Sequence, residues 1–227
     1  MISCSCDQCE IKSIFFDTIS SKSLDFYCAA RKELLVEKGT RFIKQGDQIK
    51  EFKYLKSGLV KLHKTDSHNR EQIISFGNPM DFVNIHNIFG NDVYDYSITA
   101  LEPSTICSFD IKIIKDLVQT NGAFALKLIN TISLSANRII SDSLKIRNHS
   151  LYGKVAAVLL FFADHIYVSS EYELPISRKE IAQYTGLSIE TVIRSISEFR
   201  RDGLIKVFGK RIEIIDKEGL ELIYENS

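Results

Sequence analysis

Residues 175–215 constrain the fold of this chain more strongly than any other stretch. Ser177 is placed to cap a helix, and Glu180 follows at the third helical position, which is the pattern of a capping box. Gly186 suits a left-handed turn, and Ser188 can cap a second helix directly after it. Two capped helices joined by a glycine turn predict a helix-turn-helix.

The second helix separates an inward apolar face from an outward polar stripe. The stripe consists of Glu190, Arg194, Ser197 and Arg201, which are spaced four, three and four residues apart. Beyond this helix, Leu204–Val207 and Arg211–Ile215 alternate in polarity around Phe208-Gly209-Lys210. This pattern predicts a β-hairpin, or wing, next to the helix-turn-helix.

The formal net charge of the 227 residues is zero, so binding to DNA requires a local basic patch. Between Arg194 and Arg211, six basic and two acidic residues give a net charge of +4. Basic side chains contact phosphates, an arginine can bind guanine with two hydrogen bonds, and a glutamate can accept one from cytosine. A Glu–Arg pair on an ordinary solvated helix is the alternative. We predict DNA contacts from Ser177, Arg178, Ser188, Ile189, Glu190, Thr191, Ile193, Arg194, Ser197, Arg201 and Lys210.

The part of the chain from residue 32 to 110 consists of short runs rich in β-branched and aromatic residues. Glycine or proline interrupts these runs every eight to twenty residues, which is typical of an antiparallel barrel or sandwich. The predicted strands are Glu33–Val36, Arg41–Ile43, Phe52–Lys56, Leu59–Lys64, Glu71–Phe76 and Tyr96–Phe109.

From residue 122 to 148 the hydrophobic period becomes that of one long helix with two apolar stripes. One stripe is a seam with alternating spacings of four and three, formed by Leu128, Ile132, Ser135, Ile139, Asp142 and Ile146. The other runs through Ala125, Ile129, Ala136 and Ile140. We expect one stripe to pack on the strand domain, and we assign the seam to a dimer interface. A single wide helix within a monomer is the alternative, because the seam contains two polar residues.

Composition fits a folded chain of one or two domains, with 44% hydrophobic and 26% charged residues. No apolar stretch suits a membrane helix and no secretion signal is present, so we expect a cytoplasmic protein. We divide the chain into a Cys-rich lead-in at 1–30 with a short helix near Lys22–Ala30, a strand domain at 31–120, a dimerisation helix at 121–150 and a helix-turn-helix domain at 151–227.

The segments Ile176–Ile181 and Gly186–Arg194 resemble the helix-turn-helix of the CRP/FNR family of bacterial transcription regulators, whose recognition helix carries Glu-Thr-Val/Ile-x-Arg. Matches to the family's early strands and turns are Lys38-Gly39, Gly46-Asp47, Lys56-Ser57-Gly58 and Glu71-Gln72-Ile73. The resemblance spans about residues 20–220. It implies an α+β fold with an N-terminal cyclic-nucleotide-binding-like β jelly roll, a long dimerisation helix and a C-terminal winged helix-turn-helix. It also implies an effector-modulated homodimer that binds a pseudo-palindromic operator in double-stranded DNA and works with RNA polymerase.

The roll departs from the pattern of cyclic-nucleotide binders in this family. Asn84-Ile85 stand where those proteins have Gly-Glu for the ribose, and Tyr94 stands where they have the arginine for the phosphate. Without that arginine, and with Asp95 nearby, an anionic cyclic phosphate would be held poorly. We therefore expect no binding of cAMP or cGMP.

The cysteines resemble those of the oxygen-sensing FNR branch. This likeness implies an iron–sulfur cluster held by four thiolates, and the matching residues are Cys4, Cys6, Cys9 and Cys107. The pattern departs from the branch in two respects, because Phe15 stands near the place of a further cysteine and the Cys4-x-Cys6 spacing is tight. Sensing of oxygen, redox state or nitric oxide by a cluster, thiol oxidation without metal, and no role for the cysteines all stay open. Cys28 fits a buried apolar position.

Two other classes of function compete with a DNA-binding regulator. For an enzyme, the sequence has no Gly-rich phosphate loop, His-Glu-x-x-His or Gly-x-Ser-x-Gly motif, so we predict no catalysis. His63 and His68 fit a solvated turn better than a metal site, and His86 fits a hydrogen-bonded histidine better than a haem or metal ligand. A ligand-sensing module that does not bind DNA is the second rival, and it would not need the basic stripe.

Overall fold

The computed structural model describes residues 30–79 and 81–225. Contacts divide it into two compact units, one formed by residues up to 65 with 74–138, and the other by 66–73 with the residues from 139 onward. Four of the five cysteines lie outside the described residues: Cys4, Cys6, Cys9 and Cys28. Of the helix predicted near Lys22–Ala30, only the last residue is described. The division into domains at 30, 120 and 150 stays a prediction.

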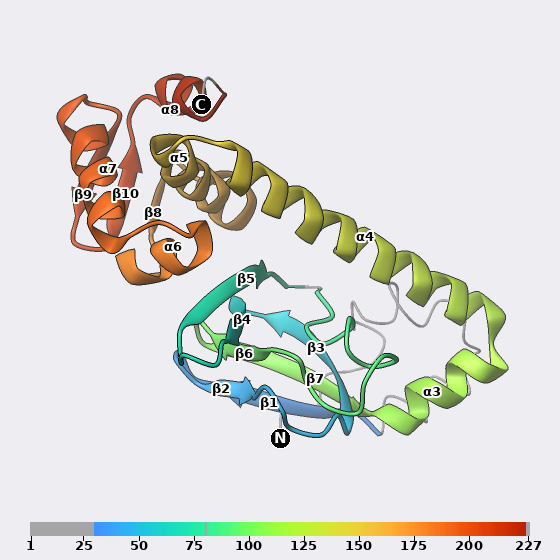
Figure 1. The fold of residues 1–227 in the computed structure, drawn as a ribbon. Helices are drawn as coiled ribbons and strands as arrows, with labels where there is room; N and C mark the ends of the chain where they lie inside the picture. Colours follow the sequence, from blue (N-terminus) through green and yellow to red (C-terminus); the bar gives the residue numbers. More distant parts are fainter. Residues whose placement is uncertain (1–29, 80, 226–227) are drawn as a thin grey trace. The chain divides into compact units, whose positions relative to one another are not determined.

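The first unit contains a β-roll of two sheets. Its strands are β1 (Lys32–Val36), β2 (Arg41–Ile43), β3 (Glu51–Ser57), β4 (Val60–Thr65), β5 (Glu71–Gly77), β6 (Ser97–Ala100) and β7 (Ser104–Asp110). They form one sheet in the order β1-β7-β3 and another in the order β2-β6-β4-β5 (Figure 1). The predicted run Tyr96–Phe109 is therefore two strands, because β6 pairs with β4 whereas β7 pairs with β1 and β3 of the other sheet.

The β1-β7-β3 sheet has a buried cluster on each face, because neighbouring strand residues point to opposite sides. In β3, Leu55 belongs to the cluster between the two sheets, and Phe52 and Tyr54 belong to the cluster on the outer face. The outer cluster also contains Phe82, Ile85, Ile88, Cys107, Phe109, Phe124 and Leu128. It therefore joins the roll, the turn segment at 82–88 and the first turns of a long helix.

Gly58, in the turn between β3 and β4, shows why glycine is required in the matched Lys56-Ser57-Gly58 motif. Its φ is +96°, a left-handed conformation that side chains disfavour. A Cβ here would lie 2.3 Å from Ser104 Oγ and 2.7 Å from the Pro103 carbonyl oxygen. The turn thus sits directly on the chain entering β7.

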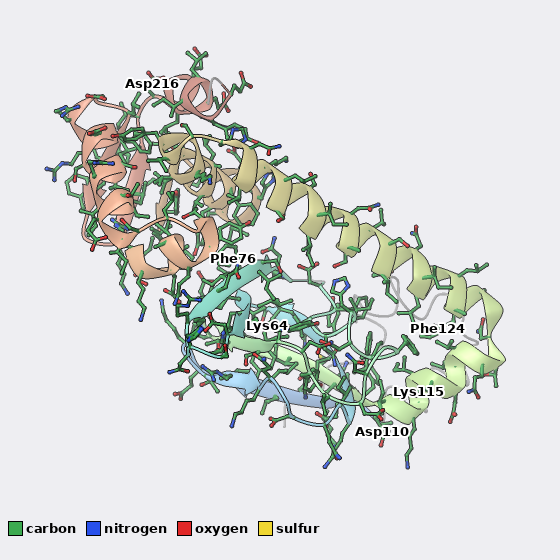
Figure 2. The ribbon with its side chains drawn as sticks, viewed as in Figure 1. Lys64, Phe76, Asp110, Lys115, Phe124 and Asp216 are labelled. Atoms are coloured by element: carbon green, nitrogen blue, oxygen red, sulfur yellow. The ribbon has the colours of Figure 1, made fainter. Side chains whose placement is uncertain are left out.

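Two helices follow the roll. Asp110 caps α3 (Ile111–Thr120) by accepting a hydrogen bond from Lys112 N at 2.8 Å (Figure 2). This helix is absent from the predicted elements. The long helix α4 (Gly122–Asn148) has the predicted extent and is uninterrupted (Figure 1). Phe124, near its start, is buried in the outer cluster (Figure 2).

The second unit is a winged helix. Its elements are α5 (Leu151–Phe161), a π-helix η2 (Phe162–Tyr167), β8 (Glu171–Glu173), α6 (Arg178–Thr185), α7 (Ile189–Arg201), β9 (Ile205–Phe208), β10 (Arg211–Ile214) and α8 (Lys217–Glu225). The strands form a sheet in the order β8-β10-β9. The predicted helix-turn-helix and wing are present, whereas β8 and α8 are not among the predicted elements. At the start of α8, Asp216 accepts a hydrogen bond from Gly219 N (Figure 2).

The fold is therefore the predicted combination of a β-roll, a long helix and a winged helix-turn-helix, with mixed helix and strand content. Within the described ranges, no helix is both long and apolar enough to cross a bilayer.

Candidate nucleic-acid interface

The two helices of the helix-turn-helix begin as their sequence indicates. Ser177 Oγ accepts from Glu180 N at 3.2 Å, and the Glu180 carboxylate accepts from Ser177 N at 2.8 Å, which completes the capping box. Ser188 Oγ accepts from Thr191 N at 3.1 Å. Gly186 has a φ of +73° between the helices. These caps fix where α7 begins and which way it faces.

The helix α7 has one buried face and one exposed face. The buried residues are Val192, Ser195, Ile196 and Phe199. The predicted outward stripe of Glu190, Arg194, Ser197 and Arg201 is exposed. The charged pair Glu190 and Arg194 therefore points to solvent one turn apart, in the first half of the helix.

Hydrogen bonds keep Glu190 ionised. Its own backbone N–H and then the Ser188 side chain lower the pKa of the Glu190 carboxyl. An ionised carboxylate accepts hydrogen bonds and cannot donate them. Among base edges in the major groove, it therefore suits the amino groups of cytosine and adenine.

Arg194 has a neighbour that the sequence analysis did not identify. The Tyr152 hydroxyl of α5 hydrogen-bonds the Glu198 carboxylate, which raises the pKa of Tyr152, and Arg194 acts on the same hydroxyl in the opposite direction. Tyr152 also packs on Phe199, with ring centroids 6.2 Å apart. Tyr152 and Glu198 thus lie beside the Arg194 side chain before any DNA is bound. Only the fold brings Tyr152 to this place, because no local motif connects it with α7.

A hollow lies along one flank of α7. Its lining residues are Arg178, Ile193, Ile196, Ser197, Arg200 and Val207, which come from α6, α7 and β9. Burial lowers the pKa of the half-buried Arg178, and Tyr172 acts in the opposite direction. Neither Arg178 nor Arg200 has an ion-pair partner among the described residues. Two guanidinium groups without carboxylate partners are suited to phosphate contacts. Arg200 is missing from the predicted site residues, although its charge was part of the basic patch.

The remaining predicted DNA contacts have varied surroundings. Thr191 is partly buried, and its N–H serves the Ser188 cap. Arg201 forms an ion pair with Asp202 at 3.3 Å. Lys210 is exposed in the turn between β9 and β10. Ile189 and Ile193 are exposed on α7. All these positions lie on α6, α7, their caps and the wing of one unit.

The dimer seam predicted on α4 requires a correction. Leu128 is 2% exposed and Ile132 packs against the outer cluster of the roll. Ser135 Oγ lies 3.0 Å from His86 Nε2, a hydrogen bond to the turn segment of the same unit. Leu128 is therefore covered by its own roll and is not available to a dimer interface. Ile132 and Ser135 contact the roll but are partly exposed, so their role in a dimer stays a prediction. Periodicity reveals two apolar stripes but does not indicate which stripe the roll covers.

The second half of the predicted seam lies in the other unit. Ile139, Asp142 and Ile146 are partly buried. Asp142 lies near Tyr184 of α6 and adds to the effect of burial, which raises the pKa of this tyrosine. The role of these three residues in a dimer stays a prediction.

Large exposed apolar side chains on α4 occupy other positions. Five such side chains are between 51% and 69% exposed, namely Leu126, Ile129, Leu134, Ile140 and Leu144. Ile129 and Ile140 belong to the second stripe identified in the sequence. The side of α4 that is available to a partner therefore contains this second stripe.

Cys107 is the one predicted cluster ligand within the described residues. It lies in the middle of β7, opposite Glu33 of β1 and Tyr54 of β3, and its thiol is buried. Its Sγ donates to Glu33 Oε1 at 3.7 Å. A hydrogen bond from Lys56 lowers the pKa of Glu33, so this carboxylate is ionised.

The described surroundings of Cys107 favour its protonated thiol. Iron binds the thiolate form of cysteine, and an adjacent carboxylate disfavours a second negative charge. Among the described residues, no group of three or more His, Cys, Asp or Glu side chains is arranged to hold a metal ion. His63 does not lie in a solvated turn as predicted: it is buried in β4, and its Nε2 lies 2.9 Å from Thr99 Oγ1.

Asn84 and Tyr94, which stand in place of cyclic-nucleotide-binding residues, form a hydrogen bond with each other. Asn84 is fully buried, and its Nδ2 donates to Tyr94 Oη at 3.2 Å and to the Glu51 carbonyl oxygen at 2.8 Å. Its Oδ1 accepts from Lys53 N at 2.9 Å. These bonds attach the turn segment to β3. The expectation that cAMP and cGMP do not bind stays a prediction.

Comparison with known proteins connects both units to one family. Residues 33–121 match the model of the cyclic nucleotide-binding domain, and residues 153–223 match the Crp-like helix-turn-helix domain. The chain is 30% identical over 186 residues to regulatory protein HlyX of Actinobacillus pleuropneumoniae, which covers 79% of this chain and 76% of that protein. The chain belongs to the CRP/FNR family.

Other members of the CRP/FNR family match over similar lengths. Electron transport regulator A of Shewanella oneidensis is 28% identical over 199 residues, covering 85% of this chain and 78% of that protein. A CRP-family transcriptional regulator from Thermus thermophilus superposes with a TM-score of 0.72 at 18% identity, covering 86% of this chain and 96% of that structure. The protein is thus a DNA-binding transcription regulator of the CRP/FNR type, and not an enzyme.

Proposed function

We propose that this regulator reads a pseudo-palindromic operator through Glu190 and Arg194, one α7 helix in each half-site. The exposed Glu190–Arg194 pair in the first half of α7 is the observation that carries the proposal. Arg194 would bind the guanine of a G·C pair, and Glu190 would accept from the amino group of its cytosine. Lys210 in the wing and Arg178 and Arg200 in the hollow would contact phosphates.

Selection of operators from random-sequence DNA tests this reading. Wild-type protein should select two inverted half-sites with centres about one helical turn apart. Arg194→Ala should lower operator affinity by about tenfold to a hundredfold and relax the preference at one base pair. Lys210→Ala is the matched control, because losing a phosphate contact should weaken all sequences alike and reduce the salt dependence. An unchanged motif for Arg194→Ala would contradict the assignment of α7.

A homodimer is the second part of the proposal, with the exposed stripe of α4 as its interface. Five large apolar side chains exposed on one helix indicate a surface covered by another chain. A symmetric partner presents the same stripe, as a two-fold interface requires. This dimer would supply the two α7 helices that a pseudo-palindromic operator needs.

The roll is the proposed sensing unit. Cys107 shares its buried cluster with Phe124 and Leu128 of α4. Because buried side chains are tightly packed, a chemical change at Cys107 would alter the packing beneath this helix. Such a change would connect an event in the roll with the proposed dimer interface, which is a coupling between two sites. A small ligand bound elsewhere in the roll is the alternative effector.

The iron–sulfur site stays a prediction from the family resemblance, because Cys4, Cys6 and Cys9 lie outside the described residues. A cluster would require the Cys107 thiol to leave Glu33 and lose its proton. Purification without oxygen, followed by absorption spectra and iron and sulfide analysis, tests it. Brown protein with about four irons per chain, and colourless Cys107→Ser protein, would support the cluster. Colourless wild-type protein with full operator affinity would favour another effector or none. Contact with RNA polymerase likewise stays a prediction.

A further inference from the structure

The outward face of α7 carries two isoleucines that have no role in the proposed recognition of a G·C pair. Ile189 is 39% exposed and Ile193 is 51% exposed. They are four residues apart and so lie above one another on one side of the helix. Each directly precedes a member of the charged pair, Glu190 or Arg194. A row of two branched alkyl groups thus runs beside the charged row.

Single exposed apolar residues are common on protein surfaces, so exposure alone does not indicate a role. The position of Ile193 is more informative. It lines the hollow that also contains the guanidinium-bearing residues Arg178 and Arg200. Ile193 is therefore next to the base-reading Arg194 in the chain and shares the hollow with the two arginines that are available to phosphates.

Thymine presents an apolar group in a comparable setting on one side of the DNA major groove. The hydrogen-bonding groups of the base pairs occupy the middle of the groove, and the phosphates form its edge. The C5 methyl group of thymine lies between them, close to the backbone of its own strand. It is also the apolar group by which thymine differs from other bases in the major groove. An alkyl side chain that adjoins both a base-reading arginine and arginines available to phosphates therefore suits this methyl group.

We propose that Ile189 and Ile193 recognise thymine by its C5 methyl group, on base pairs next to the G·C pair read by Glu190 and Arg194. This inference rests on the proposed function, and it deepens it by specifying the flanking bases. Covering one methyl group with an alkyl side chain corresponds to about threefold to tenfold in affinity.

Deoxyuridine provides the direct test, because it pairs as thymidine does but lacks the methyl group. Each thymidine of the selected half-site is replaced singly, and affinity is measured at constant salt concentration. Wild-type protein should lose about threefold to tenfold at one or two positions flanking the G·C pair. Ile193→Ala should bind the thymidine and deoxyuridine forms of its position equally. Ile193→Val, which keeps a branched alkyl group, should retain most of the discrimination.

Two results would overturn the inference. One is wild-type protein that binds every deoxyuridine operator as tightly as the parent. The other is continued discrimination by both alanine variants. In that case Ile193→Ala and Ile189→Ala protein would each still prefer thymidine to deoxyuridine at every position where wild-type protein does. Failure of the underlying proposal has a different signature, since wild-type protein would then select no motif, or Arg194→Ala would leave the motif unchanged.

Discussion

The winged helix and the β-roll assemble their functional residues by different routes. In the winged helix, the proposed contacts lie on two capped helices and a hairpin that are consecutive in the chain. In the roll, the surroundings of Cys107 arise from the pairing of β7 with β1 and β3, so Glu33 and Cys107 become neighbours although they are 74 residues apart in the chain. Local sequence therefore indicates the first site, whereas the second depends on which distant strands pair. Substitutions in the two regions should have separable effects.

The largest expected effect concerns α4. One side of this helix packs on the roll, and another carries the exposed stripe that we assign to the dimer interface. Ile140→Glu should place a charge in the proposed dimer interface and produce monomers. Operator affinity should fall by about a hundredfold or more, because the two half-sites would no longer be bound together. Sedimentation velocity and gel shifts measure both effects.

Lys115→Glu is the control for Ile140→Glu, because it introduces a carboxylate at an exposed position of another helix, α3. It should remain dimeric. Ile140→Glu protein that sediments as a dimer would contradict the interface assigned to the second stripe.

Substitutions at Leu128 and Leu126, two residues apart, test which side of α4 packs on the roll. Leu128→Ala should cost about 2–5 kcal/mol in the free energy of unfolding of the roll, because it leaves a cavity in the outer cluster. Leu126→Ala removes a side chain that is 69% exposed within one chain, so it should weaken the proposed dimer contact and leave the folding stability of the roll nearly unchanged. Urea unfolding of both variants measures the difference. Equal stabilities would show that Leu128 does not face the roll.

Loss of the capping box should lower the stability of the winged helix and leave that of the roll unchanged. Ser177→Ala removes the acceptor for Glu180 N and should destabilise the winged helix by about 0.5–2 kcal/mol. Hydrogen exchange should increase at the start of α6 and remain unchanged in β1, β3 and β7. Lys179→Ala, at an exposed position in the same turn, is the control. Faster exchange throughout the roll would contradict the separation of the two regions.

The smallest effect concerns pH and the hydrogen bond between His86 and Ser135. Burial, followed by the Arg138 cation, lowers the pKa of His86 below 6.5 in the folded protein. As the pH falls through this range, the unfolded chain takes up a proton that the folded roll resists, so folding stability decreases. His86→Gln should make stability less dependent on pH between about 7.5 and 5.5. Urea midpoints at both pH values test this, and identical pH dependence in the two proteins would contradict it.

The sequence supports detailed prediction where residue type determines local geometry. Serine caps, a left-handed glycine and alternating polarity indicate the helix-turn-helix and the wing, and the structure contains both. Tyr152 and Arg200 were missed as site residues because their place beside α7 depends on how the helices and β9 pack. The same limitation explains the seam on α4, where both stripes have helical spacing but the roll covers Leu128.

The strands of the roll were predicted from their composition, but their sheet membership was not. The run from Tyr96 to Phe109 is continuous in residue type, yet the chain changes sheets within it. For Cys107, resemblance indicates a cluster ligand, whereas the fold places an ionised Glu33 beside the thiol. That carboxylate comes from β1, and no motif around Cys107 identifies it.

The pairing of β1 with β7 has a consequence for synthesis of the protein. Lys32 pairs with Ser108 and Val36 with Ser104, so β1 emerges from the ribosome long before its neighbour. Such distant pairing is slow because a long loop must close, whereas β9 and β10 pair across a short turn. The roll is therefore translated first but closes only after its seventh strand is complete. Until then, the nascent chain presents β1 without its neighbouring strand, and an unpaired strand is a site for aggregation or chaperone binding.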